Sequence, residues 1–399
     1  MGNLFSRREI QQEVREALQN EDQALAFAKI QEHLEKENKV PLHIAVTGES
    51  GSGKSTLVNA LRGIENSDER AAPTGCVETT IEVTPYPHPN FPNVTLWDLP
   101  GIGTTKFPAA KYLKHVGFEK FDFFIIVSAD RFRENDVKLA QEFQRMKKKF
   151  YFVRSKIDNN IRDEERSQME FSAERTLTQI RDNCRQGLQA AGVQSPQVFL
   201  VSSSELHLYD FPLLEETLER ELPEHKRNAL LLAMPNISLD MINKKKKAFH
   251  SKIKFVALLS AGVAGVPVPG LSIAVDVVLL VGLVTRYVFG FGLDIPSLKR
   301  FANKTGVPYE ELKEVIISPL AAVEEITSNL VLKVLGQCSR IVVLMAAEEA
   351  SRLIPILGIP VSMGLSFAST YKCLSSILDL LAEDAQRVFK RALGLNPAE

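Results

Sequence analysis

The stretch at residues 48–55, GESGSGKS, constrains this chain most, because it has the form G-x-x-x-x-G-K-[ST]. The apolar run at 42–47 directly precedes it and predicts a short buried strand, whereas KSTLVNALRG predicts a helix that begins at Lys54. A strand, a glycine-rich loop and a helix in this order are typical of a phosphate-binding loop. Such a loop turns its backbone N–H groups towards phosphate oxygens, and the helix N-terminus adds the positive end of its dipole.

The side chains of this loop predict both nucleotide and metal contacts. We expect Lys54 to reach the β- and γ-phosphates, which makes it a predicted catalytic residue, and Ser55 to hold Mg²⁺ through its hydroxyl. A glycine-rich turn without a ligand is the alternative, and the flanking strand and helix argue against it. The predicted nucleotide contacts of the loop are Gly48, Glu49, Ser50, Gly51, Ser52, Gly53, Lys54, Ser55 and Thr56.

Two further segments predict the surroundings of the metal. Residues 65–79 are polar and contain a proline and a glycine, so they predict a flexible first switch in which Thr74 supplies a catalytic second contact to Mg²⁺. Thr79 and Thr80 remain alternatives, because the sequence does not determine which hydroxyl approaches the metal. Residues 80–86 and 94–98 predict an antiparallel pair of strands that ends in a D-x-x-G motif. There Asp98 would hold Mg²⁺ through water, and Gly101 would offer its N–H to the γ-phosphate.

A later motif predicts which base is bound. The apolar run at 150–153 leads into Ser155, Lys156, Ile157 and Asp158, which match [NTS]-K-x-D. An aspartate at this place can accept both the N1–H and the N2 amino group of guanine, donors that adenine lacks, while the lysine stem covers the base. A polar helix cap is the alternative. The strand at 198–201 ends in a run of serines that can support the base, so the predicted base contacts are Ser155, Lys156, Asp158, Ser202 and Ser203.

The order of strands and helices predicts two domains. Strands and helices alternate across 42–222, as in a doubly wound α/β domain, and Asn135 is expected to cap the helix after the apolar strand at 123–127. Residues 8–37 predict a charged, amphipathic helix with apolar residues at helical spacing, namely Ile10, Val14, Leu18, Leu25, Phe27, Ile30 and Leu34. After Pro223 only helices are expected. With the predicted guanine contacts, we therefore predict a GTP-binding α/β domain at 40–222 and an all-helical domain built from 1–39 and 223–399.

Composition excludes some classes of protein. The formal net charge is −1 over 399 residues, which gives no electrostatic footprint for nucleic acid. The 4 cysteines lie far apart, so we expect neither a disulfide framework nor a zinc site. This spacing fits a reducing compartment, and a cytoplasmic protein is predicted.

Several features bear on membrane attachment. The chain begins with MGNLFSRRE, a pattern that allows myristoylation of Gly2, although an unmodified start fits equally. Lysines 244–247 precede the uncharged stretch 255–275, whose prolines favour a helical hairpin in a core over a membrane span. The basic run itself is expected to be a solvated helix face. Residues 374–393 predict an amphipathic helix that either faces the core or lies on a membrane surface.

The four motifs, in this order and spacing, resemble a Ras-like GTPase domain. The strings AVTGESGSGKSTLVNALRGI, PTGCVETT, FPNVTLWDLPGIGT and KKKFYFVRSKID are similar to those of the interferon-inducible, immunity-related GTPases. Two branches of this family differ at the loop lysine, where one has methionine. This chain has Lys54 and therefore resembles the lysine branch. The resemblance implies a GTP-binding and GTP-hydrolysing protein of innate immunity with GTP, GDP and Mg²⁺ as ligands. It also implies a peripheral location on intracellular membranes such as ER, Golgi or vacuolar membranes.

The rate of hydrolysis is predicted to be low in the single chain. Ile102 occupies the place where many Ras-like enzymes have a glutamine that orients water, and isoleucine cannot do so. The family resemblance implies that homodimers or homo-oligomers form through the GTPase domains and complete each other's sites, with Glu78 as the catalytic candidate. A solvated switch glutamate is the alternative for Glu78. The alternative for the whole protein is a nucleotide-stabilised adaptor or scaffold with little GTP hydrolysis.

Overall fold

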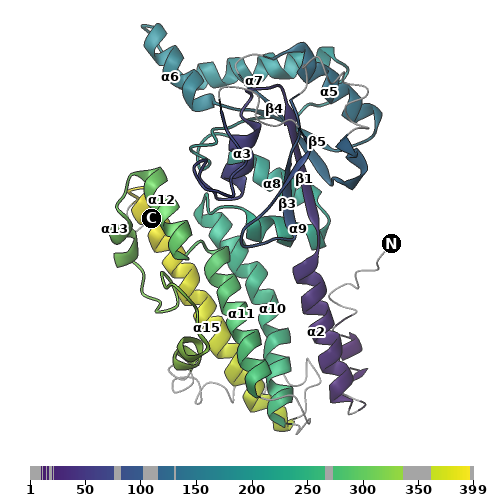
Figure 1. Cartoon of the computed structure of the whole chain (residues 1–399), viewed down its shortest axis with the longest axis vertical. Helices are drawn as coiled ribbons and strands as arrows, with labels where there is room; N and C mark the ends of the chain where they lie inside the picture. Colours follow the sequence, from purple (N-terminus) through teal and green to yellow (C-terminus); the bar gives the residue numbers. More distant parts are fainter. Residues whose placement is uncertain are drawn as a thin grey trace. The chain divides into compact units, whose positions relative to one another are not determined.

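The structure is a computed structural model that describes residues 10, 12–14, 16–17, 20, 22–75, 82–101, 116–129, 132–265, 273–335 and 361–395. The chain divides into two compact units, shown in Figure 1. One unit is the continuous stretch Pro41–Ser238, and the other combines Met1–Val40 with Leu239–Glu399.

The first unit is built on a 6-stranded sheet with the order β2-β3-β1-β4-β5-β6. Its strands are β1 (Leu42–Gly48), β2 (Thr84–Pro87), β3 (Val94–Asp98), β4 (Phe123–Ser128), β5 (Phe150–Arg154) and β6 (Val198–Leu200). The pair β2–β3 is antiparallel, as predicted, and the other neighbouring strands run parallel. Because β1 lies between β3 and β4, the order of the strands reverses at β1. In such sheets, ligands bind outside the carboxyl ends of the strands at this point.

The helices of this unit complete an α/β fold. They are α3 (Lys54–Leu61), the 3₁₀ helix η1 (Phe118–Lys120), α5 (Glu134–Arg145), α6 (Ile157–Ser167), α7 (Ala173–Ala190), α8 (Phe211–Glu221) and α9 (Glu224–Ala233). A large apolar cluster joins the strands to α5 and α7, with Phe124, Phe143, Phe152 and Leu188 fully buried. The rings of Phe124 and Phe143 lie 4.2 Å apart. This packing fixes β4 and β5, whose carboxyl ends carry the motifs discussed below.

Helix α9 places the boundary of the α/β unit later than the sequence predicted. The predicted boundary lay between residues 222 and 223, whereas the compact unit ends at Ser238. The reason is that α9 packs on β1 and β3, with Leu230 and Leu231 buried. Lys226 of α9 also forms an ion pair with Asp122, just before β4. A helix that follows the last strand can therefore still belong to the sheet's own core.

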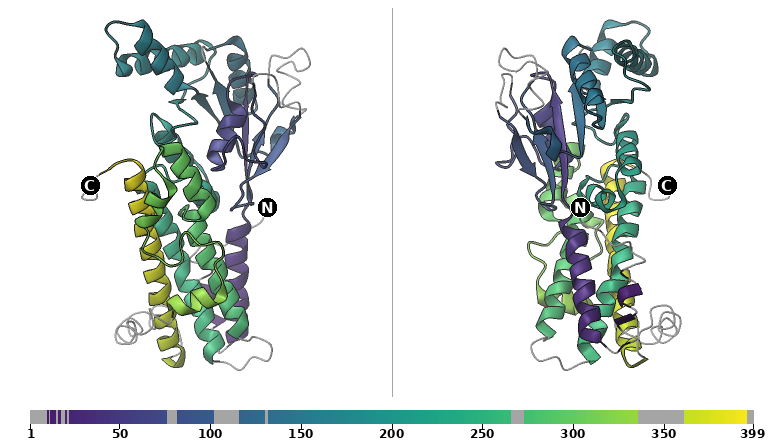
Figure 2. Two further views of the ribbon diagram at one scale, coloured as in Figure 1. Left: turned by 60° about the vertical axis from the view of Figure 1, so that its left-hand side comes forward. Right: turned by 90° about the vertical axis from the view of Figure 1, so that its right-hand side faces the viewer.

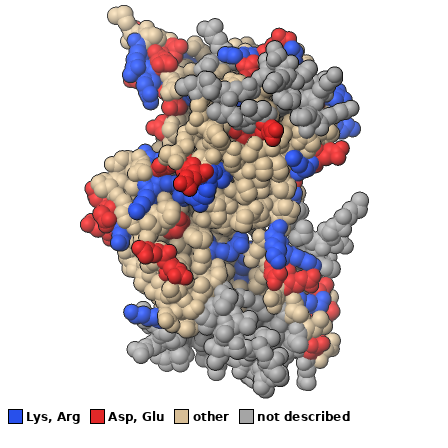
Figure 3. Space-filling model, in the orientation of Figure 1, with Lys and Arg blue, Asp and Glu red and all other residues tan. Residues whose placement is uncertain are grey.

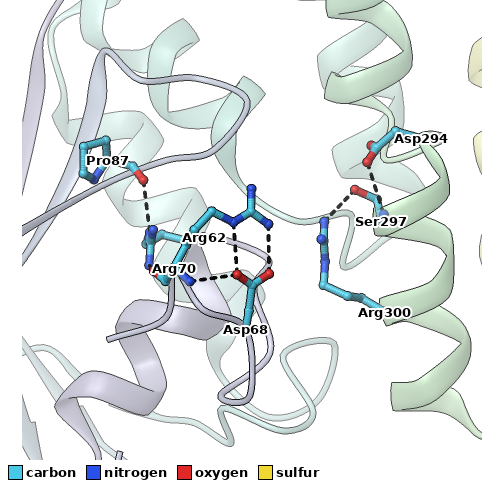
Figure 4. Close-up of polar contacts among 7 residues, drawn as sticks. All are labelled: Arg62, Asp68, Arg70, Pro87, Asp294, Ser297 and Arg300. Carbon is cyan, nitrogen blue, oxygen red and sulfur yellow. Dashed lines mark hydrogen bonds and ion pairs between the residues drawn. The ribbon is translucent and has the colours of Figure 1, made fainter. Parts of the chain in front are cut away.

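The second unit is helical. It contains α2 (Gln23–Lys39), α10 (Leu239–Gly265), α11 (Ile273–Gly290), α12 (Ile295–Thr305), α13 (Tyr309–Glu314) and α15 (Val361–Ala392). Both views in Figure 2 show α10, α11 and α15 as long neighbouring helices. At the start of α12, Asp294 accepts a hydrogen bond from the N–H of Ser297, whose hydroxyl accepts one from Arg300 (Figure 4).

The predicted N-terminal helix at 8–37 is broken. Described residues from 10 to 17 are helical, a turn follows at Asn20, and Asp22 then caps α2 by accepting a hydrogen bond from the N–H of Leu25. Ile30 and Leu34 of the predicted apolar set are buried, whereas Leu25 is 45% exposed and does not belong to the buried face. The aspartate cap explains the break, because its carboxylate satisfies a free N–H group at the start of a new helix.

The apolar stretch after residue 255 forms two helices, α10 and α11, as predicted. Phe249 of α10 packs on Tyr287 of α11 with ring centroids 4.8 Å apart. A Cβ atom on Gly290 would lie 2.5 Å from the Phe249 ring, so this close approach requires glycine. Among the described residues, none of the helices combines the length and apolar character needed to cross a membrane.

The basic run at 244–247 is only partly the solvated face that the sequence predicted, because Lys247 is exposed but Lys245 is buried. Lys245 is 1% exposed, and its ammonium group donates a hydrogen bond of 2.8 Å to the carbonyl oxygen of Gly290. Lys246 forms an ion pair of 2.8 Å with Asp379 of α15. These contacts hold α10 against α11 and α15. On the face drawn in Figure 3, basic and acidic side chains are interspersed.

The closing helix α15 faces the core, so the membrane-surface alternative is wrong. Its basic side chains are also engaged: Arg387 pairs with the fully buried Asp384, and Arg391 pairs with Glu311. Asp384 further accepts hydrogen bonds of 2.7 and 2.8 Å from the N–H groups of Ile317 and Ser318. The buried apolar residues of the predicted face are Leu374, Ile377, Leu378, Leu381, Ala385, Val388 and Phe389.

Candidate nucleotide-binding site

The glycine-rich loop between β1 and α3 has the backbone conformation of a phosphate-binding loop. Gly48, Gly51 and Gly53 have φ angles of 141°, 77° and 92°, which L-residues with a side chain rarely adopt. A Cβ atom on Gly48 would also lie 2.1 Å from the carbonyl oxygen of Val127 on β4. The loop therefore packs against the neighbouring strand in a way that only glycine permits.

Polar side chains line the inside of this loop. Lys54 is only 6% exposed, and its ammonium group donates a hydrogen bond of 2.8 Å to the carbonyl oxygen of Glu49. The hydroxyl oxygen of Ser52 is buried and has no hydrogen-bond partner within the described part of the chain. A buried hydroxyl without a partner is costly unless a ligand satisfies it. Together with the adjacent cation, this hydroxyl fits a phosphate oxygen.

The predicted metal contacts of the loop and of the D-x-x-G motif meet. Parallel pairing aligns Val46 of β1 with Asp98 of β3, so Asp98 reaches the start of α3. There the hydroxyl of Ser55 donates a hydrogen bond of 2.5 Å to the Asp98 carboxylate, which is fully buried. A hydroxyl and a carboxylate are oxygen ligands that suit Mg²⁺, which usually binds through few protein groups and several waters.

Gly101 lies against the phosphate-binding loop. A Cβ atom at this residue would be 2.9 Å from the backbone nitrogen of Ser50. Only glycine lets the two backbones approach so closely, and the D-x-x-G motif therefore closes one side of the loop. Thr56 follows Ser55 in the first turn of α3 and is half-buried.

The [NTS]-K-x-D segment is tied to the same loop by its first two residues. The hydroxyl of Ser155 donates to the carbonyl oxygen of Ser52 at 2.6 Å and also lies 3.1 Å from the carbonyl oxygen of Ser128. Lys156 has a φ angle of 56°, and its ammonium group donates to the carbonyl oxygen of Gly51 at 3.0 Å. The lysine stem therefore extends from β5 back to the phosphate loop, beside the place where a base would lie.

Asp158 lies in the first turn of α6, opposite the serine run that follows β6. Its carboxylate accepts a hydrogen bond of 3.3 Å from the hydroxyl of Ser204, which is itself 2.8 Å from the hydroxyl of Ser202. Ser202 is buried and Ser203 half-buried, and the contact with Asp158 comes from the exposed Ser204. The run of three serines pointed to this place, but the sequence could not tell which hydroxyl faces the aspartate.

The first switch is described only in part. Thr74 is exposed at the end of the described stretch 22–75. Glu78, Thr79, Thr80, Ile102 and Gly2 lie outside the described residues. Helix α3 holds the described part of the predicted flexible stretch, because Asn59 binds Ala72 and Arg62 binds the carbonyl oxygen of Arg70. Figure 4 shows the surroundings of Arg62, which also binds Pro87 of β2.

Glu49 makes contacts that the sequence did not predict. Its carboxylate accepts hydrogen bonds from Arg133 at 2.7 Å and from Asn135 at 2.8 Å. The predicted cap of α5 by Asn135 is therefore wrong, because the N-cap residue is Arg133. The sequence does not reveal these partners of Glu49, because they lie at the start of α5, more than 80 residues further along the chain.

The cap of α5 is completed by Asp136. Its carboxylate accepts hydrogen bonds from the hydroxyl of Ser128 at 2.8 Å and from the N–H of Arg133 at 3.0 Å. Burial raises the pKa of Asp136 to about 6, although these hydrogen bonds act in the opposite direction. Its carboxyl group consequently takes up a proton at a higher pH than an exposed aspartate does.

The sheet order, the phosphate loop and the motifs at its edge define the fold of a Ras-like P-loop GTPase domain. The sequence model of the protein family Interferon-inducible GTPase (IIGP) matches residues 7–392 of this chain. The chain belongs to the interferon-inducible GTPase family, in agreement with the resemblance of its motifs.

Individual relatives support this membership, two of them over most of the chain. Interferon-inducible GTPase 5 of Rattus norvegicus is 43% identical over 381 residues, which cover 95% of this chain and 82% of the relative. Interferon-gamma-inducible GTPase 10 of Mus musculus is 38% identical over 358 residues, covering 90% of this chain and 83% of the relative. Immunity-related GTPase family M protein 1 of Mus musculus is 43% identical over 185 residues, or 46% of this chain and 44% of the relative.

Proposed function

We propose that this chain binds GTP and GDP with Mg²⁺ and hydrolyses GTP slowly as a single molecule. The observation that carries the proposal is the convergence of two motifs, D-x-x-G and [NTS]-K-x-D, on the phosphate loop. Ser55 meets Asp98, Gly101 backs Ser50, and Lys156 reaches Gly51. Bound Mg²⁺ would neutralise charge on the β- and γ-phosphates.

Each group at the loop has a separate task in this proposal. Lys54 supplies a fixed cation for the phosphates, and the hydroxyl of Ser52 supplies a donor that is otherwise unsatisfied. Asp158 selects guanine through its two acceptor oxygens, with Ser204 holding one of them in place. The positive end of the α3 dipole adds to the attraction for phosphate.

We further propose that hydrolysis accelerates when two copies pair through their GTPase domains. Ile102 cannot orient water, so a second chain has to supply or order the missing group. Turnover per molecule is then expected to rise with protein concentration, because the active species is a dimer. The measurement is specific activity over two decades of concentration at saturating GTP, with light scattering on the same samples.

The adaptor hypothesis predicts a different result in the same experiment. A chain that only uses the nucleotide for stability binds GTP normally but shows a low and flat activity profile. An assembly that grows without any gain in activity would also contradict catalytic pairing. Glu78→Gln serves as the comparison for the catalytic candidate, since it removes the carboxylate but keeps its size.

We propose that the protein attaches to membranes only through a myristoyl chain on Gly2. The basic run and the closing helix are not proposed as membrane contacts, because Lys245, Lys246 and Arg391 pack or pair within the helical unit. One myristoyl chain gives a partition constant of only about 10⁴ M⁻¹, so a monomer attaches weakly. A nucleotide-dependent assembly that carries several acyl chains would attach far more strongly, because the second chain inserts at a high effective concentration.

Fractionation of cells tests this attachment. Gly2→Ala is expected to move most of the protein to the supernatant, whereas Asn3→Ala, which keeps the acylation pattern, leaves it on membranes. In permeabilised cells a slowly hydrolysed GTP analogue should increase the membrane fraction of the wild type and not of Gly2→Ala. Equal distributions of all three proteins would contradict the membrane proposal and leave the nucleotide proposal intact.

A further inference from the structure

Helix α3 directs polar side chains inward at a place where a helix usually buries apolar ones. Ser55, Asn59 and Arg62 are spaced by four and three residues, so they lie along one face, with Arg62 just after the helix. Asn59 is fully buried and Arg62 nearly so. Buried polar groups are costly unless they are hydrogen-bonded. The hydrogen-bond partners of Asn59 and Arg62 therefore show what this polar face of α3 does.

Asn59 binds both backbone polar groups of a single residue. Its side-chain nitrogen donates to the carbonyl oxygen of Ala72 at 2.9 Å, and its side-chain oxygen accepts from the N–H of Ala72 at 2.7 Å. The same nitrogen also donates to the side-chain oxygen of Asn66 at 3.0 Å. These partners determine the orientation of the amide, since its oxygen has to face the N–H group.

Arg62 binds the segment before Ala72 and also the end of β2. It donates hydrogen bonds to the carbonyl oxygens of Arg70 at 2.9 Å and Pro87 at 3.2 Å, and it lies over the ring of Tyr86. Figure 4 shows the bond to Pro87 beside the ion pair of Arg70 with Asp68. Residues 66–72 are thus fixed to the helix that follows the phosphate loop, and Ala72 is the last of these anchors.

The position of this last anchor limits Thr74. An extended chain advances at most about 3.3–3.6 Å per residue, so the Cα of Thr74 lies within about 7 Å of that of Ala72. Ser55, whose hydroxyl lies next to Asp98, is on the same face of α3 as Asn59. The clamp between Asn59 and Ala72 therefore limits how far Thr74 can move from the helix face that carries Ser55.

We propose that Asn59 is a positioning residue for Thr74 in the binding of Mg²⁺ and a nucleoside triphosphate. It does not contact the nucleotide; it fixes Ala72 so that Thr74 can reach the metal without a further loss of backbone freedom. The inference rests on the proposed function. Since switch segments bind Mg²⁺ when the γ-phosphate is present, the loss of Asn59 should affect the triphosphate more than the diphosphate.

The test measures the affinities of a non-hydrolysable GTP analogue and of GDP, each with and without Mg²⁺. Asn59→Ala is expected to weaken binding of the analogue relative to GDP by about tenfold, because binding then has to order the freed backbone. This difference should disappear without Mg²⁺. If Asn59→Ala does not fold, Asn59→Ser is used, since its single hydroxyl cannot bind both groups of Ala72.

Arg62→Met is the matched control, because it keeps an apolar stem and leaves the Asn59–Ala72 pair in place. It is expected to lower the melting temperature while leaving the ratio of the two affinities unchanged. Equal losses for analogue and GDP in Asn59→Ala, or the same shift of the ratio in Arg62→Met, would overturn the inference. Wild type that binds neither nucleotide would instead refute the proposed function.

Discussion

Asp158→Asn is expected to weaken GTP binding by about 10²–10³-fold and to improve binding of xanthosine triphosphate. The aspartate accepts from two N–H donors of guanine in the proposed complex, and hydrogen bonds to a charged group are worth about 1.5–3 kcal/mol each. Asparagine offers one acceptor and one donor. Xanthine carries a carbonyl oxygen in place of the amino group of guanine, so it matches that changed pattern.

The measurement is a titration of each protein with GTP, xanthosine triphosphate and ATP. Asp163→Asn is the matched control: it makes the same change of charge on an exposed residue of the same helix, α6. We expect it to bind GTP as the wild type does. Undiminished GTP affinity in Asp158→Asn would show that the base is recognised elsewhere.

The sequence predicted the sheet and the place of the site because each motif directly follows an apolar run. Strand β4 is buried along its whole length and β1 at every residue except the half-buried His43, so their hydrophobic runs identify them as strands. Parallel pairing then brings their carboxyl ends to one edge. The convergence of Ser55 with Asp98 follows from that rule and from the order of the strands.

The polar contacts that hold the site could not be predicted in the same way. Asn59, Arg133 and Ser204 bind groups that are close in space but far apart in sequence or separated by irregular chain. Such partners leave no periodic pattern. Asn135 was predicted to cap a helix because asparagine favours that position. In the structure its side chain instead donates a hydrogen bond to the Glu49 carboxylate.

The run of lysines at 244–247 also shows that charge alone does not predict which side chains are exposed. Four successive lysines usually indicate a solvated helix face, but a helix that packs on two neighbours turns some of them inward. Lys245 is buried because the carbonyl oxygen of Gly290 lies within hydrogen-bonding distance, at a point where glycine lets α11 approach α10. Which lysine of such a run faces inward depends on tertiary packing.

Lys54→Ala is expected to have the second large effect, a loss of GTP affinity of at least about 10²-fold with a smaller loss for GDP. The ammonium group lies inside the loop, where the carbonyl oxygen of Glu49 orients it at 2.8 Å. Removing it leaves the γ-phosphate without its fixed cation from this loop. A hydrogen bond between charged groups is worth about 1.5–3 kcal/mol. Lys54 is expected to make one such contact with each of two phosphates.

The comparison that makes this result specific is Lys138→Ala, which removes a lysine from the surface of α5, where it pairs with Glu134. It should bind both nucleotides normally. Thermal unfolding without nucleotide shows whether the loop itself has collapsed in Lys54→Ala. If the variant melts as the wild type does and still binds the GTP analogue fully, the loop is not the phosphate site, and the meeting of Ser55 with Asp98 would need an explanation other than a metal. Loss of the analogue with retained GDP would instead place the Lys54 ammonium group at the γ-phosphate, where hydrolysis takes place.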